Sequence, residues 1–307
     1  MKSQKFLTGF AVLALSTLVL AACAPDKKAE DTPKESSTEQ TTEKSSATEE
    51  EAPAEKIAGA DLQDGTYELE EKNENNDYRA VFSITVKDGK IAESKYDNIN
   101  KDGKSKADDK EYQEMMKEKA GVGPADFIPA LNEALVAAQT ADGVEVVTGA
   151  THSTDSFKNY AQQLIQAAQA GKTDKIEIDN GAELKDGEYT LEEKNYSNEY
   201  RTTFTIVVKD KKVTESKYDN VNEAGKSKTE DKGYNDMMKE KSGTGPSEFI
   251  PALNKAFVAA EGQPAEVEVV TGATHSTHAF QMYAEQLINA AEKGDTAKIE
   301  VDNIVMK

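Results

Sequence analysis

The sequence contains the same segment twice, and this duplication limits the possible folds more than any other feature. Residues 59–180 align with residues 181–307, and about two-thirds of the positions in 59–138 agree with those in 181–260. Each copy is about 120 residues long, which is enough for one domain with its own hydrophobic core. Units of this length do not need to stack as solenoid repeats do. The chain is therefore predicted to form two tandem domains of one fold class, residues 59–180 and 181–307.

The first half of each copy has the pattern of β-strands. In the first copy, apolar residues alternate with polar ones in two places: Tyr67 and Leu69, then Phe82, Ile84 and Val86. Asp88-Gly89 marks a hairpin turn into a further strand at Ile91–Tyr96. The second copy has Asp210-Lys211 at that turn, which is a weaker signal. We expect an antiparallel sheet at the start of each copy.

The second half of each copy has the pattern of helices. A short helix is expected at Tyr112–Lys119, and Gly123-Pro124 opens another, with Phe127, Ile128, Leu131 and Leu135 on one face. A third helix is expected around residues 153–165 and ends at Gly171, and Lys175–Ile178 is expected to be a closing strand. The predicted fold class is α+β, with a mainly antiparallel sheet and helices in each domain.

One stretch is identical in the two copies. Val144–Thr154 returns 123 positions later as Val267–Thr277 with no residue changed. The β-branched run at its start predicts a strand, and Gly149-Ala150 predicts a sharp turn into the third helix. The three histidines of the chain, His152, His275 and His278, lie in or beside these stretches. Two identical stretches predict two equivalent sites.

The residues after the turn suit an anion. Thr151, Ser153 and Thr154 are expected where a helix begins, and free backbone N–H groups and the positive end of the helix dipole favour a phosphate there. A hydroxyl held at such a place could be esterified. The alternative is that Ser153 or Thr154 only caps the helix and the glycine only allows the turn.

These residues carry a resemblance to a known family. Thr148-Gly149-Ala150-Thr151 and Thr271-Gly272-Ala273-Thr274 resemble the [S/T]-G-A-[T/S] signature of FMN-binding domains, the family of the flavin subunits of Na⁺-pumping and Rnf-type oxidoreductases. The resemblance implies two covalent FMN groups, each joined to Thr151 or Thr274 by a phosphodiester bond. It also implies a flavin transferase, using FAD and Mg²⁺, as a partner.

An acidic residue precedes each signature. The family pattern has an aspartate three residues before the first threonine of the signature, and this chain has Glu145 and Glu268 there. Both residues keep the negative charge. The resemblance therefore implies that Glu145 and Glu268 are the residues that the transferase recognises.

The beginning of the chain is typical of a bacterial lipoprotein. Residues 1–22 combine two early lysines with an apolar run and predict a signal peptide, and small residues precede Cys23 as in a lipobox. Cys23 is the only cysteine of the chain, so acylation is its expected use. Residues 23–58 are rich in Glu, Lys, Thr, Ser and Pro and are predicted to be a disordered tether. The expected location is the outer face of the cell membrane, through a lipid anchor.

The combination of anchor, tether and two signatures resembles the lipoproteins of Gram-positive flavin-based extracellular electron transfer. That resemblance implies a membrane NADH dehydrogenase and the quinone pool as electron donors, and ferric iron or soluble flavins as acceptors. It implies an electron-transfer flavoprotein more than a classical enzyme, with reduction of ferric iron or another extracellular acceptor as its reaction.

Two other functions remain open at this point. A non-redox surface lipoprotein could bind a small molecule or a protein through the same domains. A hydrolase using Thr and His would need a base positioned by a carboxylate, and no acid has constant spacing after the histidines. The net charge of −20 argues against nucleic acid as a partner.

Other residues of the chain are candidates for ligand contacts. Asp155 replaces His278 in the first copy, so no metal site is expected in both. Six tyrosines could stack on a flavin, although aromatic residues of strands and helices more often belong to the core: Tyr78, Tyr96, Tyr112, Tyr200, Tyr218 and Tyr234.

Overall fold

The computed structural model describes residues 56–307. The predicted signal peptide, residues 1–22, and Cys23 lie outside the described residues, as does most of the predicted tether. Both copies of the repeat lie within one compact unit. None of the helices in residues 56–307 has the length and apolar character needed to cross a membrane.

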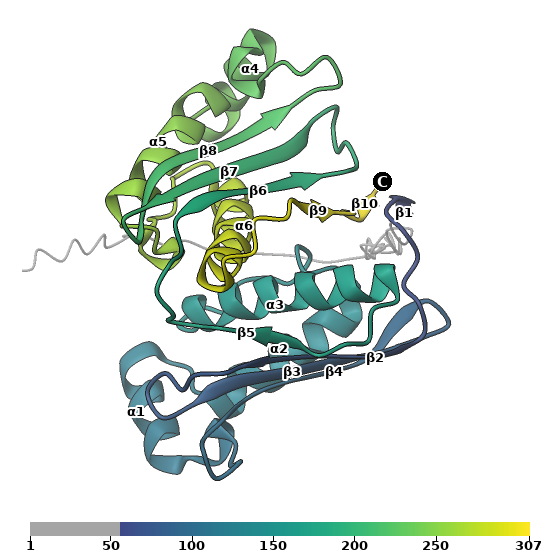
Figure 1. The fold of residues 1–307 in the computed structure, drawn as a ribbon, viewed down its shortest axis with the longest axis vertical. Helices are drawn as coiled ribbons and strands as arrows, with labels where there is room; N and C mark the ends of the chain where they lie inside the picture. The colour runs from purple at the N-terminus through teal and green to yellow at the C-terminus, as the bar shows by residue number, and fades with distance from the viewer. Residues whose placement is uncertain (1–55) are drawn as a thin grey trace, which may run out of the picture. The chain divides into compact units, whose positions relative to one another are not determined.

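Each copy has one four-stranded sheet, and it is mainly antiparallel, as predicted. Three strands form an antiparallel meander, and the fourth returns from the end of the copy to pair in parallel with the first strand of that meander (Figure 1). The first sheet has the order β4-β3-β2-β5: β2 (Gly65–Glu71), β3 (Arg79–Lys87), β4 (Lys90–Ile99) and β5 (Ile176–Ile178). The second has the order β8-β7-β6-β9: β6 (Gly187–Glu193), β7 (Arg201–Lys209), β8 (Lys212–Val221) and β9 (Ile299–Val301).

Three α-helices follow the meander in each copy. In the first copy they are α1 (Lys110–Ala120), α2 (Pro124–Ala138) and α3 (Thr151–Ala170), after a 3₁₀ turn η1 (Lys106–Asp108). In the second copy they are α4 (Lys232–Ser242), α5 (Pro246–Ala259) and α6 (Thr274–Lys293), with 3₁₀ turns η2 (Lys228–Glu230) and η3 (Pro264–Glu266). The predicted helices and the α+β fold class are confirmed.

Aromatic rings join the third helix to the sheet in both cores. Phe157 of α3 lies 4.8 Å from Phe82 and 5.2 Å from Tyr96, measured between ring centroids. Phe280 of α6 has the same relation to Phe204 and Tyr218, at 4.9 and 5.1 Å. The period-two pattern of β3 and β7 places Phe82 and Phe204 on the inner face of each sheet. The third helix is thereby fixed over the middle of the sheet.

One asparagine joins the second helix to the edge strand. Asn132 Oδ1 accepts hydrogen bonds from Ser94 Oγ and the Tyr96 N–H, both at 2.7 Å. Its Nδ2 donates to the carbonyl oxygens of Tyr96 at 3.0 Å and Ile128 at 3.1 Å. Asn254 makes the same four contacts in the second copy. The amide thus satisfies backbone groups of β4 that no further strand covers.

The end of the predicted tether is structured, which corrects the boundary at residue 58. Lys56–Ala58 forms β1 and pairs antiparallel with β10 (Val305–Met306). A strand is stable only with a partner, and this partner lies about 250 residues away in sequence. Local composition could not reveal the pairing.

The third helices of the two copies contact each other. Asn159 Nδ2 and Gln163 Nε2 of α3 each donate to Asn289 Oδ1 of α6, at 3.2 Å. Gln166 Nε2 donates to Gln286 Oε1 at 3.3 Å. Side-chain amides thus make these hydrogen bonds between α3 and α6.

We expect Asn132→Ala to lower the free energy of unfolding by about 2 kcal/mol, because it leaves backbone groups of β4 without partners. The matched control is Glu133→Ala, one residue further along α2 and exposed, which should change stability by less than about 0.5 kcal/mol. Chemical denaturation followed by circular dichroism measures both. Equal stability of the two variants would contradict the role given to the Asn132 amide.

Candidate functional site

The identical stretch begins with an irregular segment, not the predicted strand. Val144–Thr148 pairs with no strand among the described residues. Its backbone groups bond locally instead: the Val144 N–H donates to Ala141 O at 3.2 Å, and the Val147 N–H donates to Thr154 Oγ1 at 3.2 Å. β-branched residues favour a strand only where a ladder partner is available. The motif is therefore a loop-turn-helix corner.

The glycine of the motif passes against the end of the preceding helix. Gly149 has φ of 84° and Gly272 has φ of 82°, in the left-handed region. A Cβ atom at Gly149 would overlap the carbonyl oxygen of Ala120, the last residue of α1. At Gly272 it would overlap the carbonyl oxygen of Ser242, the last residue of α4. The turn therefore requires glycine for two separate reasons.

The threonine at the end of the motif holds the turn closed. Thr154 is fully buried, and its hydroxyl donates to Ala150 O at 3.0 Å while accepting from the Val147 N–H. Thr277 makes the same pair of hydrogen bonds to Ala273 and Val270. These two hydroxyls are inside the protein and already bonded. They are not available for esterification.

The predicted acceptor threonines are exposed at the first position of the third helices. Thr151 begins α3 and Thr274 begins α6, each 20 residues long. The N-cap residues are Ala150 and Ala273, and no side chain caps either helix. The interpretation of Ser153 or Thr154 as a capping residue is therefore wrong. The first turn of each helix presents uncapped N–H groups and contains no acidic residue.

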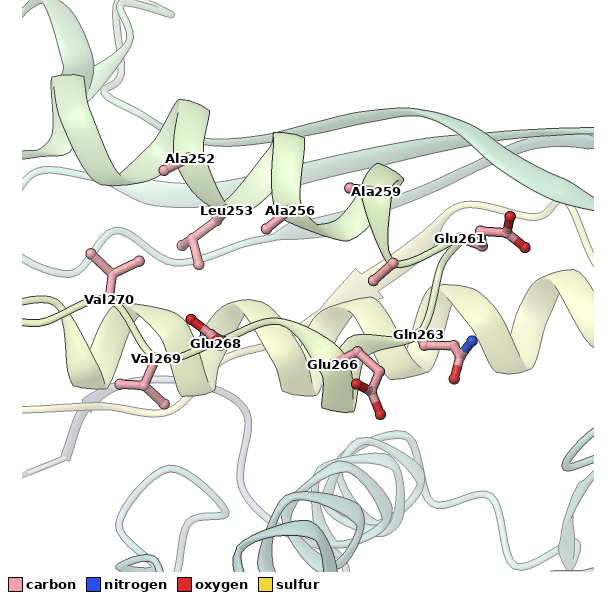
Figure 2. A pocket seen from close by; sticks show the side chains of 11 residues that line it. Ala252, Leu253, Ala256, Ala259, Glu261, Gln263, Glu266, Glu268, Val269 and Val270 are labelled. Atoms are coloured by element: carbon pink, nitrogen blue, oxygen red, sulfur yellow. The ribbon is translucent and has the colours of Figure 1, made fainter. Parts of the chain in front are cut away.

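Glu145 and Glu268, the predicted recognition residues, are exposed three residues before the signatures. Glu268 lines an open groove of about 830 Å³ between α5 and the segment that leads into the motif. Figure 2 shows the small side chains of α5 on one wall of this groove and Glu268 with Val270 on the other. The carboxylate is accessible from solvent beside a mostly apolar surface.

A smaller cavity lies at the start of α6. Its volume is about 300 Å³, within the range of sites for small molecules. The first turns of α6 contribute His275, Ser276 and Ala279, which lie one, two and five positions after the predicted acceptor Thr274. The second copy contributes polar and aromatic side chains: Glu193, Tyr200, Thr202, Tyr218, Asn220, Lys228, Tyr234 and Tyr283. Three of the six tyrosines that the sequence offers as candidates, Tyr200, Tyr218 and Tyr234, thus line one cavity with His275 and Ser276.

A lysine lies over two of these tyrosines. Lys228 Nζ is 4.0 Å from the ring centroid of Tyr234 and 4.9 Å from that of Tyr200. The Tyr200 hydroxyl donates to Asp231 Oδ2 at 2.8 Å, and this hydrogen bond, with burial, raises the pKa of Tyr200 to about 12. Tyr200 therefore remains a neutral hydrogen-bond donor throughout the physiological range.

The first copy repeats this cluster. Lys106 Nζ lies 4.2 Å from the ring centroid of Tyr112 and 5.0 Å from that of Tyr78, whose hydroxyl donates to Asp109 Oδ2 at 2.8 Å. The same hydrogen bond raises the pKa of Tyr78 to about 12. The lysine and aspartate were missed from the sequence. The signal that could have identified them is the equal spacing of the four residues in both copies.

A second tyrosine of each copy is bonded to a carboxylate. Tyr283 donates to Glu193 Oε1 at 2.6 Å, and Tyr160 donates to Glu71 Oε1 at 2.5 Å. Burial, together with the charge of Glu193, raises the pKa of Tyr283 well above its ordinary value. Each of these pairs connects the third helix of its copy to the end of the first strand of the meander.

Two histidines of the second copy contact aspartates of the first. His275 Nε2 lies 3.3 Å from Asp142 Oδ2 at an exposed position. His278 Nδ1 lies 3.3 Å from Asp155 Oδ1, and both of these side chains are largely buried. Asp155 and His278 occupy equivalent positions of α3 and α6 and meet each other. Within residues 56–307, no group of three or more His, Cys, Asp or Glu side chains could hold a metal ion.

Comparison with known proteins gives two relatives. No family model matches the chain. The 15 kDa lipoprotein of Treponema pallidum is 31% identical over 116 residues, which cover 38% of this chain and 82% of the relative. The crystal structure of the CPE2226 protein of Clostridium perfringens is 39% identical, covers 38% of this chain and 97% of its own, and superimposes with a TM-score of 0.37.

We expect Gly149→Ala to lower the free energy of unfolding by about 3 kcal/mol, because backbone strain adds to the overlap with Ala120. Gly103→Ala is the matched control: Gly103 has φ of 73°, but nothing lies within 4 Å of an added Cβ atom. Only strain of about 1 kcal/mol applies there. Chemical denaturation measures the free energy of unfolding of both variants. An equal decrease in the two would show that the backbone at Gly149 does not lie tightly against the end of α1.

Proposed function

The chain belongs to the family of the 15 kDa lipoprotein of Treponema pallidum, and on that premise we propose a membrane-anchored lipoprotein that carries FMN on Thr151 and Thr274. The observation that supports the proposal best is the exposure of these two hydroxyls at helix N-termini that no side chain caps. Cys23 is the proposed site of the lipid anchor. The proposed role is electron transfer to acceptors outside the membrane.

The residues around each acceptor threonine fit a phosphodiester. The free N–H groups of the first helical turn and the positive end of the dipole of a 20-residue helix favour a negative charge. Thr151 and Thr274 would each lose the hydroxyl proton and take the FMN portion of FAD, with AMP as the leaving group. The buried Thr154 and Thr277 compete with neither reaction, since their hydroxyls hold the turn.

The proposed place for the planar ring of the flavin is the cavity at the first turns of α6. Tyr200 and Tyr234 offer ring faces, Lys228 supplies a positive charge, and Asn220 supplies an amide. When bound, FMN supplies a centre that accepts and releases one or two electrons. Asp231 holds the hydroxyl of Tyr200, so this ring keeps one orientation. Tyr78, Tyr112 and Lys106 are proposed to do the same beside Thr151.

The proposed partners follow from this role. A flavin transferase that uses FAD and Mg²⁺ would load both sites and would read Glu145 and Glu268, whose side chains are exposed. A membrane NADH dehydrogenase and the quinone pool would donate electrons. Ferric iron or soluble flavins would accept them.

A second candidate is a non-redox surface lipoprotein that binds a small molecule or a protein. The open groove between α5 and the segment around Glu268 favours this alternative, since its wall includes Ala252, Ala256 and Val269 (Figure 2). This candidate predicts a colourless protein even when a flavin transferase is present during expression. The covalent flavin proposal predicts a yellow one.

Protein expressed with a flavin transferase and FAD should gain the mass of two FMN groups less two water molecules, because there are two equivalent acceptors. Thr151→Ala and Thr274→Ala should each remove one increment, and the double variant should remove both. Ser153→Ala and Ser276→Ala are matched controls that keep both increments. Intact-mass spectrometry decides the outcome, and an unmodified wild-type mass would rule out the assignment.

Glu145→Gln should slow flavin loading at Thr151 and leave loading at Thr274 unchanged, because the transferase would lose one carboxylate only. The second copy serves as an internal control, and Glu268→Gln should give the reverse result. Time courses of peptide mass after proteolysis measure the two rates, with circular dichroism to show an intact fold. Identical rates at both sites would mean that these carboxylates are not recognised.

A further inference from the structure

At one equivalent position, the third helix of each copy places a side chain in the other copy. Gln162 of α3 belongs to the first copy, but it lines the cavity of the second copy together with Glu193, Tyr218 and Tyr283. Its side chain is 8% exposed. The equivalent residue of α6, 123 positions later, is Glu285. Because α3 and α6 pack against each other, α3 places Gln162 in the second copy and α6 places Glu285 against the first copy.

The neighbours of Glu285 belong to the first copy. Contacts with α3 lie on both sides of it along α6: His278 meets Asp155 at 3.3 Å, and Asn289 accepts a hydrogen bond from Asn159 at 3.2 Å. The carboxyl group of Glu285 lies close enough to Asp155 and Glu71 to be affected by their charges. Its own charge acts on the hydroxyl groups of Tyr96 and Tyr160. Glu71, Tyr96 and Tyr160 are the counterparts of the Glu193, Tyr218 and Tyr283 that surround Gln162.

We propose that each copy completes the site of the other through this position, so that the site at Thr151 contains the ionisable carboxyl of Glu285 and the site at Thr274 contains the neutral amide of Gln162. For the identity of the bound group this inference rests on the proposed function. Two sites with identical motifs thereby differ by one titratable side chain. The difference is supplied in each case by the other copy.

The protonation of Glu285 changes in an accessible pH range. Burial, and then the charges of Asp155 and Glu71, raise its pKa to about 8, although the neighbouring amide of Asn159 acts in the opposite direction. The carboxyl group is therefore neutral at pH 7 and ionised above pH 8. Other charged or titratable groups face it directly or through Asp155: Tyr96, Tyr160, His278, Lys158 and His152.

This difference should separate the reduction potentials of the two sites. A negative charge beside an electron acceptor disfavours the addition of further negative charge, and more so where water is excluded. Above pH 8 the site at Thr151 has this charge from Glu285, whereas Gln162 provides none at Thr274. The potential at Thr151 should therefore fall more steeply between pH 7 and pH 9 than the potential at Thr274.

The test uses full-length protein loaded with one FMN at a time. Thr274→Ala keeps only the group at Thr151, and Thr151→Ala keeps only the group at Thr274. In each background, spectroelectrochemical titration at several pH values measures the potential with and without Glu285→Gln. The substitution should remove the extra pH dependence at Thr151 and have no effect at Thr274. Gln162→Glu should introduce extra pH dependence at Thr274.

The reverse pattern of pH dependence, or an equal effect of Glu285→Gln at both sites, would overturn the proposal.

Unloaded protein gives a second test that does not depend on FMN. The carbon-13 shift of the Glu285 carboxyl should titrate near pH 8, and Glu71→Gln should lower that midpoint while the matched change Glu193→Gln should not. If only Glu193→Gln changed the midpoint of the Glu285 titration, Glu285 would lie in the site of the second copy and the proposal would be wrong. If the intact mass showed no flavin loading, the flavin assignment would be wrong, but the titration of Glu285 in the unloaded protein would still test where its carboxyl group lies.

Discussion

The close contact between the motif glycine and the end of the preceding helix determines the rest of the site. Because Gly149 has no side chain, the turn can lie against the last carbonyl group of α1. The turn then directs α3 back across the sheet, with Phe157 in the core and Thr154 inside the turn. Thr151 is left at the surface as a consequence. A single missing Cβ atom thus fixes both the buried and the exposed threonine.

The two copies share the parts that make a site and differ where their third helices meet. Asn132 and Asn254, the lysine-tyrosine clusters and the tyrosine-glutamate pairs are repeated with nearly equal distances. The facing positions of α3 and α6 are not repeated, since Asp155 meets His278. Duplication supplied two equal domains, and substitution at the contact made them unequal. The residues that the two third helices present to each other are therefore among the positions where the copies differ.

Much of the fold could be predicted because its signals are local. The period of two in β3, the Asp88-Gly89 turn and the helix that begins at Pro124 depend only on neighbouring residues. The same turn forms at Asp210-Lys211 without glycine, both residues having positive φ, because the flanking strands pair strongly enough to impose it. The predicted strand at Val144–Val147 failed for the opposite reason, since no strand was available to pair with it.

The candidate site was only partly predictable. The signature in the sequence proposes Thr151 and Thr274, and both side chains are exposed in the structure. The contribution of Gln162 and Glu285 could not be predicted, because it depends on how two helices separated by more than 100 residues pack against each other. The lysines over the tyrosines could be predicted in part. Their repetition is visible in the sequence, but their contact with the tyrosine rings is visible only in the structure.

The pairing of β1 with β10 has a mechanical consequence. Lys56 lies opposite Met306 and Ala58 opposite Val305, so the segment that enters the first domain is hydrogen-bonded to the segment that leaves the second. A pulling force applied through the chain before Lys56 would act first on this short ladder, and the four-stranded sheets would be loaded only after it had opened. The ladder is therefore the first point at which tension on the chain before Lys56 would meet the folded domains.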